Sequence, residues 1–299
     1  MITLAGLRYS RVMAADGGPV ARLVCAAASE LGERVFTAQA TLRDELMPSR
    51  PVRQLWSTAD GGGTARSPLL ARIKAVSEAL ERWAHWTLHA SPDAARYGFD
   101  VDPSSNGLAA FPGLLARQAR RPALLEAAER FNLLHWWEGR LPARWQPSPW
   151  PGIEAVVIAS AVPGVTVVLH RREEPDRHAF GHAAGATFTA ACRRALSELE
   201  RHRAVMRHAA RAKVAVPADT VAAPMSTLER RSVFFSTDAG FAMFAARVAA
   251  APRSAPAAPR VVFDGRVDGP WSRYADVWRV VFEPPSRRFC SRETEYFWW

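Results

Sequence analysis

The stretch Ala71–Arg82, A-R-I-K-A-V-S-E-A-L-E-R, combines a helical repeat of small and apolar residues with a pair of glutamates. On either side of it, apolar residues recur every three to four positions from Pro68 to His89, which predicts one long helix. A proline is well suited to the first turn, because a backbone N–H has no helical partner there. Glu78 and Glu81 are three positions apart, so they share one face of the predicted helix.

The same acidic pattern occurs again further along the chain. Glu126–Arg130 repeats E-x-x-E-R in a second predicted helix over residues 122–138, and Glu198–Arg201 is a looser copy in a third helical region over residues 181–213. Two such helices facing each other would bring four carboxylates together. These are Glu78, Glu81, Glu126 and Glu129.

Carboxylate clusters hold hard cations such as Mg²⁺, and Mg²⁺ usually accompanies a nucleotide phosphate. Di-iron helical proteins use E-x-x-H pairs, which these motifs lack, so all-oxygen ligation favours Mg²⁺ over iron or zinc. Arg82 and Arg130 would then be placed for phosphate oxygens. The alternative is that Glu78 with Arg82, and Glu126 with Arg130, are ion pairs on exposed helix faces, worth about 0.2–0.5 kcal/mol each.

A glycine run, Gly61-Gly62-Gly63, precedes the first helix. Its backbone N–H groups could hold a phosphate at the helix start, but no G-K-[ST] follows, so a flexible loop is the alternative interpretation. An internal similarity links this region to a later one. Ala71, Ala75 and Glu78 recur as Ala191, Ala195 and Glu198, again after a glycine-containing segment. Alanines at this spacing permit close packing of a helix.

Strand-like runs alternate with the predicted helices. Residues 154–170 predict a hairpin interrupted by Pro163-Gly164, and residues 260–263 and 277–282 predict two strands near the end of the chain. Residues 100–113 predict a loop with a turn at Ser104-Ser105-Asn106-Gly107. The expected class is therefore α+β (mixed α/β), organised as a single domain over residues 1–299.

Composition limits the remaining possibilities. The 299 residues are 48% hydrophobic, which allows a substantial core, and no apolar run approaches the roughly 20 residues of a membrane span. Three scattered cysteines predict a reduced, cytoplasmic protein with no membrane partner. The net charge of +10 is compatible with a nucleotide, an acidic peptide or nucleic acid as partner, and equally with an arginine-rich composition.

Taken in order, the motifs resemble those of the YcaO family of ATP-dependent peptide-modifying enzymes. The resemblance extends from about Gly61 to Arg203. Four segments carry it: Lys74–Arg82 (K-A-V-S-E-A-L-E-R), Ser105–Ala109 (S-N-G-L-A), Glu126–Arg130 (E-A-A-E-R) and Arg194–Arg201 (R-A-L-S-E-L-E-R).

The resemblance implies a YcaO-like fold, in which sheets pack against long helices that carry the E-x-x-E-R motifs. It also implies a site for ATP and Mg²⁺. The four expected metal-binding and catalytic carboxylates are Glu78, Glu81, Glu126 and Glu129. The residues expected to contact the nucleotide, or to support those ligands, are Lys74, Arg82, Ser105, Asn106, Arg130, Arg194, Glu198, Arg201, Arg279 and Glu283.

Members of the family use ATP to phosphorylate a peptide-bond oxygen in a ribosomally made precursor peptide. The resemblance implies azoline formation by a neighbouring Cys, Ser or Thr, or alternatively thioamide formation with external sulfide. Lys74 replaces the usual Ser and Arg201 the usual Gln, so a catalytically reduced scaffold that binds peptide or partner is a third possibility. The expected partners are the precursor peptide and a separate leader-peptide-binding or sulfur-delivering protein. A homodimer is compatible with the pattern, and nucleic acid is not expected.

Overall fold

The computed structural model describes residues 4–47, 55–160, 162–174, 176–211, 225–254 and 258–298. The chain forms two compact units, each assembled from separate stretches of sequence. Unit 1 comprises Met1–Pro51, Thr58–Ala127 and Arg260–Glu283, and unit 2 comprises Val52–Ser57, Ala128–Pro259 and Pro284–Trp299. The expectation of a single domain over the whole chain stays a prediction.

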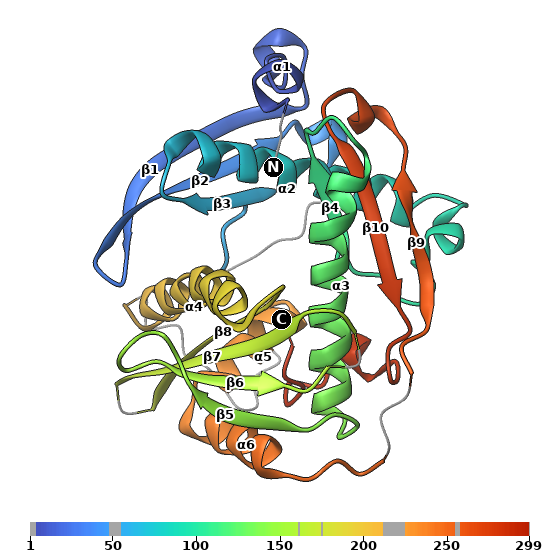
Figure 1. Ribbon diagram of the computed structural model, residues 1–299. Coiled ribbons are helices and arrows are strands. Elements are labelled where there is room, and N and C mark those ends of the chain that lie inside the picture. The colour runs from blue at the N-terminus through green and yellow to red at the C-terminus, as the bar shows by residue number, and fades with distance from the viewer. Residues whose placement is uncertain are drawn as a thin grey trace. The chain divides into compact units, whose positions relative to one another are not determined.

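In unit 1, an antiparallel sheet has the strand order β1-β2-β3 and carries helix α2 on one face (Figure 1). The elements are β1 (Val20–Glu30), β2 (Glu33–Leu42), β3 (Gly61–Ala65) and α2 (Pro68–His89). Helix α2 begins and ends where its periodicity predicts. The glycine run, however, is an edge strand, so the expectation of a flexible loop is wrong.

Close packing between β3 and α2 explains why these positions are glycine. A Cβ atom built on Gly61 would lie 2.1 Å from the carbonyl oxygen of Ala75, and one on Gly63 would lie 2.3 Å from that of Ala71. Both alanines are fully buried. The helix backbone therefore rests directly on the strand backbone, and any larger side chain on either element would force them apart.

The second sheet of unit 1 has the order β4-β10-β9, with its central strand supplied by the late part of the chain. Its strands are β4 (Leu108–Phe111), β9 (Val261–Val267) and β10 (Asp276–Phe282). The two late strands confirm the sequence prediction, whereas β4 occupies part of the predicted 100–113 loop. The preceding Gly107 has φ +73°, and its Cβ would lie 2.0 Å from the Val280 carbonyl oxygen, so only glycine fits this turn.

Helix α3 (Arg117–Trp137) passes from unit 1 into unit 2, since the boundary lies between Ala127 and Ala128. It begins earlier than the predicted 122–138. Pro122, expected near the start of the helix, instead lies inside it, where it removes one backbone hydrogen bond. In unit 1, Ala123 and Ala127 pack against Val280.

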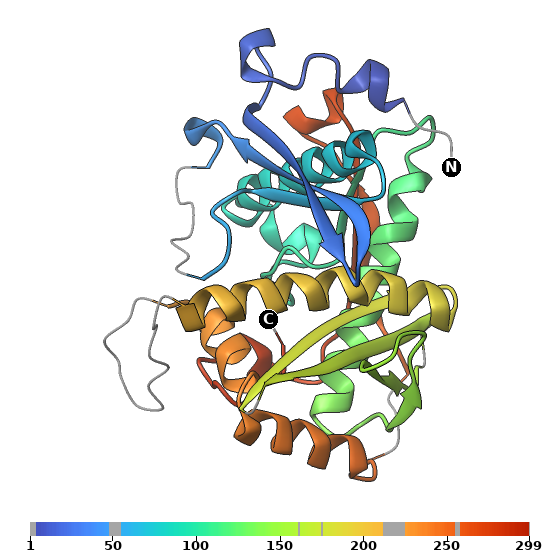
Figure 2. The same ribbon diagram turned by 90° about the vertical axis from the view of Figure 1, so that its left-hand side faces the viewer.

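In unit 2, a four-stranded antiparallel sheet has the order β5-β6-β7-β8, with α4 on one face and α6 on the other (Figure 2). The hairpin predicted over residues 154–170 is present as β6 and β7. The elements of this unit are β5 (Ala143–Pro147), β6 (Glu154–Ile158), β7 (Val165–Glu174), β8 (Arg177–Gly185), α4 (Phe188–Arg211), α5 (Thr227–Phe235) and α6 (Asp238–Ala249).

The internal similarity seen in the sequence has a structural counterpart. Strand β8 packs against α4 as β3 packs against α2: a Cβ on Gly181 would lie 2.3 Å from the Ala195 carbonyl oxygen, and one on Gly185 would lie 2.5 Å from the Ala191 nitrogen. Each unit thus contains an edge strand with glycines facing the alanines of the following helix.

Aromatic side chains dominate the core of unit 2, and the end of the chain belongs to it. Phe297 is fully buried and its ring contacts those of Trp136, Phe180 and Phe244, among others. The buried Arg231 guanidinium donates hydrogen bonds to four carbonyl oxygens of the same tail. The acceptors are Phe289, Ser291 and Glu293, at 2.8–3.0 Å, and Trp298 at 3.4 Å.

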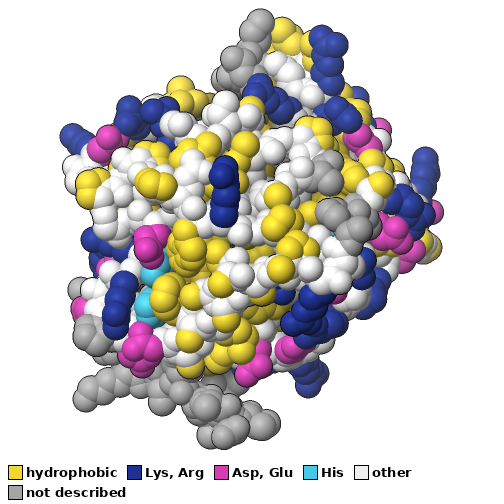
Figure 3. Space-filling view, turned by 60° about the horizontal axis from the view of Figure 1, so that its bottom comes forward, with side chains coloured by type: hydrophobic (Ala, Val, Ile, Leu, Met, Phe, Trp, Pro, Cys, Tyr) yellow, Lys and Arg dark blue, Asp and Glu magenta, His cyan; other side chains and the backbone are white. Residues whose placement is uncertain are grey.

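Four side chains of unit 2 form a continuous hydrogen-bonded line. His170 Nδ1 lies 2.9 Å from Glu154 Oε2, and His170 Nε2 lies 2.9 Å from His178 Nδ1. His178 Nε2 lies 2.7 Å from Asp238 Oδ1. Figure 3 shows histidine side chains next to acidic ones on the face that it draws, beside a hydrophobic area. Both histidine rings also stack on Phe241.

The remaining elements are short. They are α1 (Ala5–Arg8) and the 3₁₀ turns Ala14–Asp16, Asp44–Leu46, Ala94–Tyr97, Pro270–Arg273 and Arg288–Cys290. Within the described ranges, no helix is both long enough and apolar enough to cross a membrane.

Candidate functional site

Two of the four predicted carboxylates lie on α2, and each accepts a backbone N–H from an edge strand of unit 1. Glu78 Oε2 accepts from Gly62 of β3 at 2.9 Å. Glu81 Oε1 accepts from Ala110 of β4 at 2.7 Å. Because β3 and β4 are edge strands, these amides have no strand partner on that side, and the glutamates satisfy them. Through these two hydrogen bonds, Glu78 and Glu81 link α2 to both sheets of unit 1.

Glu126, on the part of α3 that belongs to unit 1, completes a group of three carboxylates. Burial raises the pKa of Glu81 well above its usual value, and the negative charges of Glu126 and Glu78 raise it further. The Ala110 N–H and the Arg82 charge oppose this effect only in part. The three side chains therefore form one electrostatic group, in which a bound cation would relieve mutual repulsion.

Glu129 is one turn further along α3, in unit 2, and it is held from two sides. His182 Nδ1 of β8 donates to Glu129 Oε1 at 2.6 Å, and the backbone N–H of Ala184 donates to Oε2 at 3.1 Å. Burial alone would lower the pKa of His182. The hydrogen bond and charge of Glu129, together with the charge of Glu198, outweigh that effect and raise it above the usual value.

Two of the predicted nucleotide-binding cations lie on α2. Lys74 Nζ donates to the Thr64 carbonyl oxygen at 2.7 Å, while its side chain remains exposed. Arg82 forms the predicted i,i+4 ion pair with Glu78, at 3.7 Å, and is half-buried. The long, loose ion pair leaves the Arg82 guanidinium able to turn toward a phosphate without breaking a close hydrogen bond to Glu78.

The predicted Ser105 and Asn106 lie in the turn before β4 and are half-buried. Arg279 is fully buried beneath this region: it donates to the carbonyl oxygens of Asp102 at 2.6 Å and Ser104 at 3.2 Å, and it lies 3.5 Å from the Phe99 ring centre. Arg279 therefore holds the backbone of this turn in place through these two hydrogen bonds.

Glu283 does not share the environment of Arg279, contrary to the alternation expected on one strand. It lies just beyond β10, is exposed, and makes a bidentate pair with Arg260 at 2.5 and 2.6 Å. A register shift between Val281 and Phe282 breaks the alternation of sides.

In unit 2, the Arg130 guanidinium is buried between two rings, 3.9 Å from the centre of Trp298 and 4.5 Å from that of Phe289. On α4, Arg194 is exposed, and Glu198 pairs with Arg201 at 3.1 Å. Arg130 is thus built into the core beside the end of the chain, whereas the α4 residues remain at or near the surface.

The donor set fits Mg²⁺ in chemical type, since it consists of carboxylates whose charges raise the pKa of one member. Within the part of the chain that the structure describes, no group of three or more His, Cys, Asp or Glu side chains is close enough to hold a metal ion. Ligation by all the expected glutamates therefore stays a prediction.

Comparison with solved structures identifies relatives in fold. A chain of the E. coli microcin synthetase McbBCD complex matches with a TM-score of 0.54 at 11% identity, over 87% of both chains. A chain of that complex with pro-MccB17 bound matches with a TM-score of 0.52 at 12% identity, also over 87% of both chains. YcaO from Methanopyrus kandleri, bound with AMPPCP and Mg²⁺, aligns over 91% of this chain and 88% of its own, at 15% identity and a TM-score of 0.49.

The chain has the fold of chains of the E. coli microcin synthetase McbBCD complex. At these identities the matches establish the fold alone, and neither the models of protein families nor the curated proteins provide a match. The predicted α+β class and the predicted resemblance are confirmed at this level. In this fold, the two E-x-x-E-R motifs lie on the long helices α2 and α3, as expected.

Sequence reasoning missed two residues beside the carboxylates of this chain. His182 was not singled out, because a lone histidine in a strand belongs to no recognisable motif. The Tyr9 hydroxyl lies 2.7 Å from Ser77 Oγ, next to Glu78 in sequence, and burial raises its pKa. Tyr9 lies far from α2 in sequence, and only folding brings the two together.

Proposed function

We propose that this protein is an ATP- and Mg²⁺-dependent enzyme that activates backbone amides of a ribosomally made precursor peptide and converts them into azolines. The carboxylate group of unit 1 carries the proposal. Burial and the charges of Glu126 and Glu78 raise the pKa of Glu81, an arrangement that lowers stability unless a cation or a proton offsets the charge. Mg²⁺ bound to a nucleotide is the cation that suits such oxygen ligands.

The chain's residues would divide the work as follows. Glu78, Glu81 and Glu126, all of unit 1, would hold Mg²⁺, and Arg82, with its loose ion pair, would contact phosphate oxygens. ATP supplies the phosphoryl group that turns the peptide-bond oxygen into a leaving group. A Cys, Ser or Thr side chain of the peptide then attacks the amide carbon, and phosphate departs with that oxygen.

The fold shared with chains of the microcin synthetase complex supports a peptide substrate, because one of those structures contains pro-MccB17. It also supports a partner protein that delivers the peptide, since the synthetase is a complex. Thioamide formation with a sulfur-delivering partner is the closest alternative reaction. Mass spectrometry separates the two, since an azoline has lost water and a thioamide has exchanged oxygen for sulfur.

One observation favours a catalytically reduced scaffold as a second candidate. Three residues expected at the nucleotide or the metal are engaged within the protein: Arg130 between two rings, Arg279 with two carbonyl oxygens, and Glu129 with His182. Phosphate release that depends on the peptide distinguishes the candidates. An enzyme would release phosphate with its peptide and partner present, whereas a scaffold would release none.

The decisive experiment is calorimetric titration of ATP, with and without Mg²⁺, into the wild type, Glu81→Gln and Glu126→Gln. Glu33→Gln is the matched control, because Glu33 is an exposed glutamate of β2 in the same unit. The proposal requires Mg²⁺-dependent binding by the wild type and the control, and its loss in both site variants. If the folded wild type does not bind ATP even with its partner protein present, the result would favour the catalytically reduced scaffold instead.

A further inference from the structure

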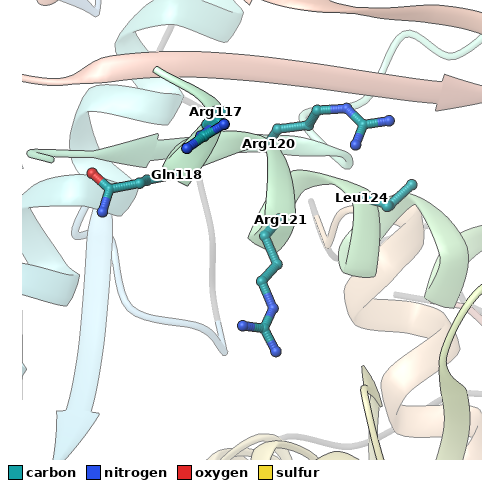
Figure 4. A pocket seen from close by; sticks show the side chains of 5 residues that line it. All are labelled: Arg117, Gln118, Arg120, Arg121 and Leu124. Atoms are coloured by element: carbon teal, nitrogen blue, oxygen red, sulfur yellow. The ribbon is translucent and has the colours of Figure 1, made fainter. Parts of the chain in front are cut away.

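The first two turns of α3, in unit 1, line an open surface hollow of about 410 Å³ with cationic side chains. The lining residues are Arg117, Gln118, Arg120, Arg121 and Leu124. In Figure 4, Arg121 points away from the helix, and the Gln118 and Leu124 side chains extend to either side of it. The proposed nucleotide site uses none of these residues.

The charges of this pocket are only partly balanced. Arg120 makes a bidentate contact with Asp264, at 3.0 and 2.6 Å, and Asp264 also accepts from the Trp278 indole at 2.7 Å. Arg117 and Arg121 are exposed, and the first turn of α3 contains no acidic residue. The positive end of the helix dipole therefore adds to the arginine charge, and the pocket favours an anionic ligand.

Apolar side chains extend the same surface. Leu114 and Leu115, which immediately precede α3, are 57% and 49% exposed, and Leu124 lines the hollow. A phosphate or a nucleic-acid backbone would use the arginines and leave these leucines in water. A polypeptide with acidic and apolar side chains would use both.

We propose that Arg117, Arg121 and Leu124, together with Leu114 and Leu115, form a docking surface for an acidic, leucine-containing segment of the precursor peptide. This inference rests on the proposed function, because that function supplies the peptide as the partner. Carboxylates of the segment would pair with Arg117 and Arg121. Its apolar side chains would cover the three leucines.

The test is fluorescence anisotropy with a labelled peptide of alternating Glu and Leu, titrated with the wild type and with R117E/R121E. Arg120 is left intact because of its pair with Asp264. R11E/R22E is the matched control, since both arginines are exposed in unit 1 and the charge change is equal. We expect binding about tenfold weaker for R117E/R121E and little changed for the control. Equal losses in both variants would overturn the proposal.

Two further probes establish which chemistry the surface recognises. A peptide of alternating Glu and Ser, or a short DNA duplex, should bind more weakly than the Glu-Leu peptide. Equal binding of either would show a general anion surface and reject the peptide assignment. Mg²⁺-dependent ATP titration of R117E/R121E separates the two proposals. If R117E/R121E loses peptide binding but keeps ATP binding, the result supports both the docking surface and the proposed enzyme. If the wild type itself does not bind ATP, the result rejects only the proposed enzyme.

Discussion

His182 of β8 donates a 2.6 Å hydrogen bond to Glu129 of α3, so the fourth predicted metal ligand is fixed by a residue outside every sequence motif. Both side chains are largely buried, with 13% and 15% of their surfaces exposed. The pair therefore locks the orientation of the Glu129 carboxylate.

The His182–Glu129 contact predicts strong coupling in a double-mutant cycle. His182→Leu or Glu129→Leu alone should each destabilise the protein by about 1.5–3 kcal/mol, because each leaves a buried polar partner unsatisfied. The double variant should cost less than the sum, since both polar groups are then absent. Denaturation by urea measures the three free energies of unfolding. Strict additivity would show that the contact contributes nothing.

Glu81→Gln should stabilise the protein in the absence of Mg²⁺, by about 1 kcal/mol at pH 8. The folded-state pKa of Glu81 is raised, so the folded state retains a proton that the unfolded chain releases above its own pKa. Wild-type stability therefore falls as pH rises through this window, and the gain from the amide grows with pH. Melting temperatures at pH 5 and pH 8 measure this. Glu33→Gln is the control, and an equal gain at both pH values would contradict the prediction.

Gly61→Ala and Gly181→Ala should each destabilise the protein by about 1–3 kcal/mol or more, because the added methyl meets helix backbone. The nearest atoms would be the Ala75 carbonyl oxygen at 2.1 Å and the Leu199 nitrogen at 2.2 Å. Gly6→Ala is the matched control, since nothing lies within 4 Å of a Cβ there. Denaturation midpoints provide the measurement. Unchanged midpoints for the first two variants would show that strand and helix can separate at no cost.

His202 should make unit 2 sensitive to acid. It is buried, its Nδ1 accepts from the Phe180 N–H at 3.0 Å, and burial lowers its pKa to about 4. At pH values between the folded-state pKa of His202 and its unfolded-state pKa of 6.5, the native state binds fewer protons than the unfolded chain. Stability therefore falls as pH drops from 6.5 toward 4, by on the order of 2 kcal/mol at pH 5. His202→Gln should flatten this dependence.

Chemical denaturation at several pH values between 5 and 7 tests the acid sensitivity. His208→Gln is the matched control, because His208 lies exposed on the same helix. The slope of stability against pH should decrease for the His202 variant and remain unchanged for the control. Identical slopes for all three proteins would assign the acid sensitivity elsewhere.

The elements that sequence alone predicted are those with strong periodicity or alternation. The bounds of α2 followed from its apolar spacing, and the β6–β7 hairpin from its β-branched runs. Gly61–Ala65 was misread because glycine usually marks a turn, whereas here it permits contact with a helix. Helix α5 had a readable signal, since Ser226 and Glu229 form a capping box, yet its nine residues are too few for clear periodicity.

The candidate site was predictable only where one helix supplies both members of a pair. Spacing identified Glu78 with Glu81, and Glu126 with Glu129, because positions three apart share a helix face. His182 and Tyr9 depend on contacts between segments distant in sequence, for which a single chain gives no pattern. The burial of Arg130 between Trp298 and Phe289 was likewise hidden, since those rings come from the end of the chain.

Strand β10, the middle strand of its sheet, and Phe297, at the centre of the aromatic core, both come from the last part of the chain. During translation, β4 and most of the core of unit 2 emerge before the segments that complete them. Neither unit can therefore close while the ribosome is still making those residues, and exposed strand edges and aromatic rings persist until those residues have emerged. Expression yield should accordingly depend on chaperones that protect nascent chains, more than for a protein whose domains are continuous in sequence.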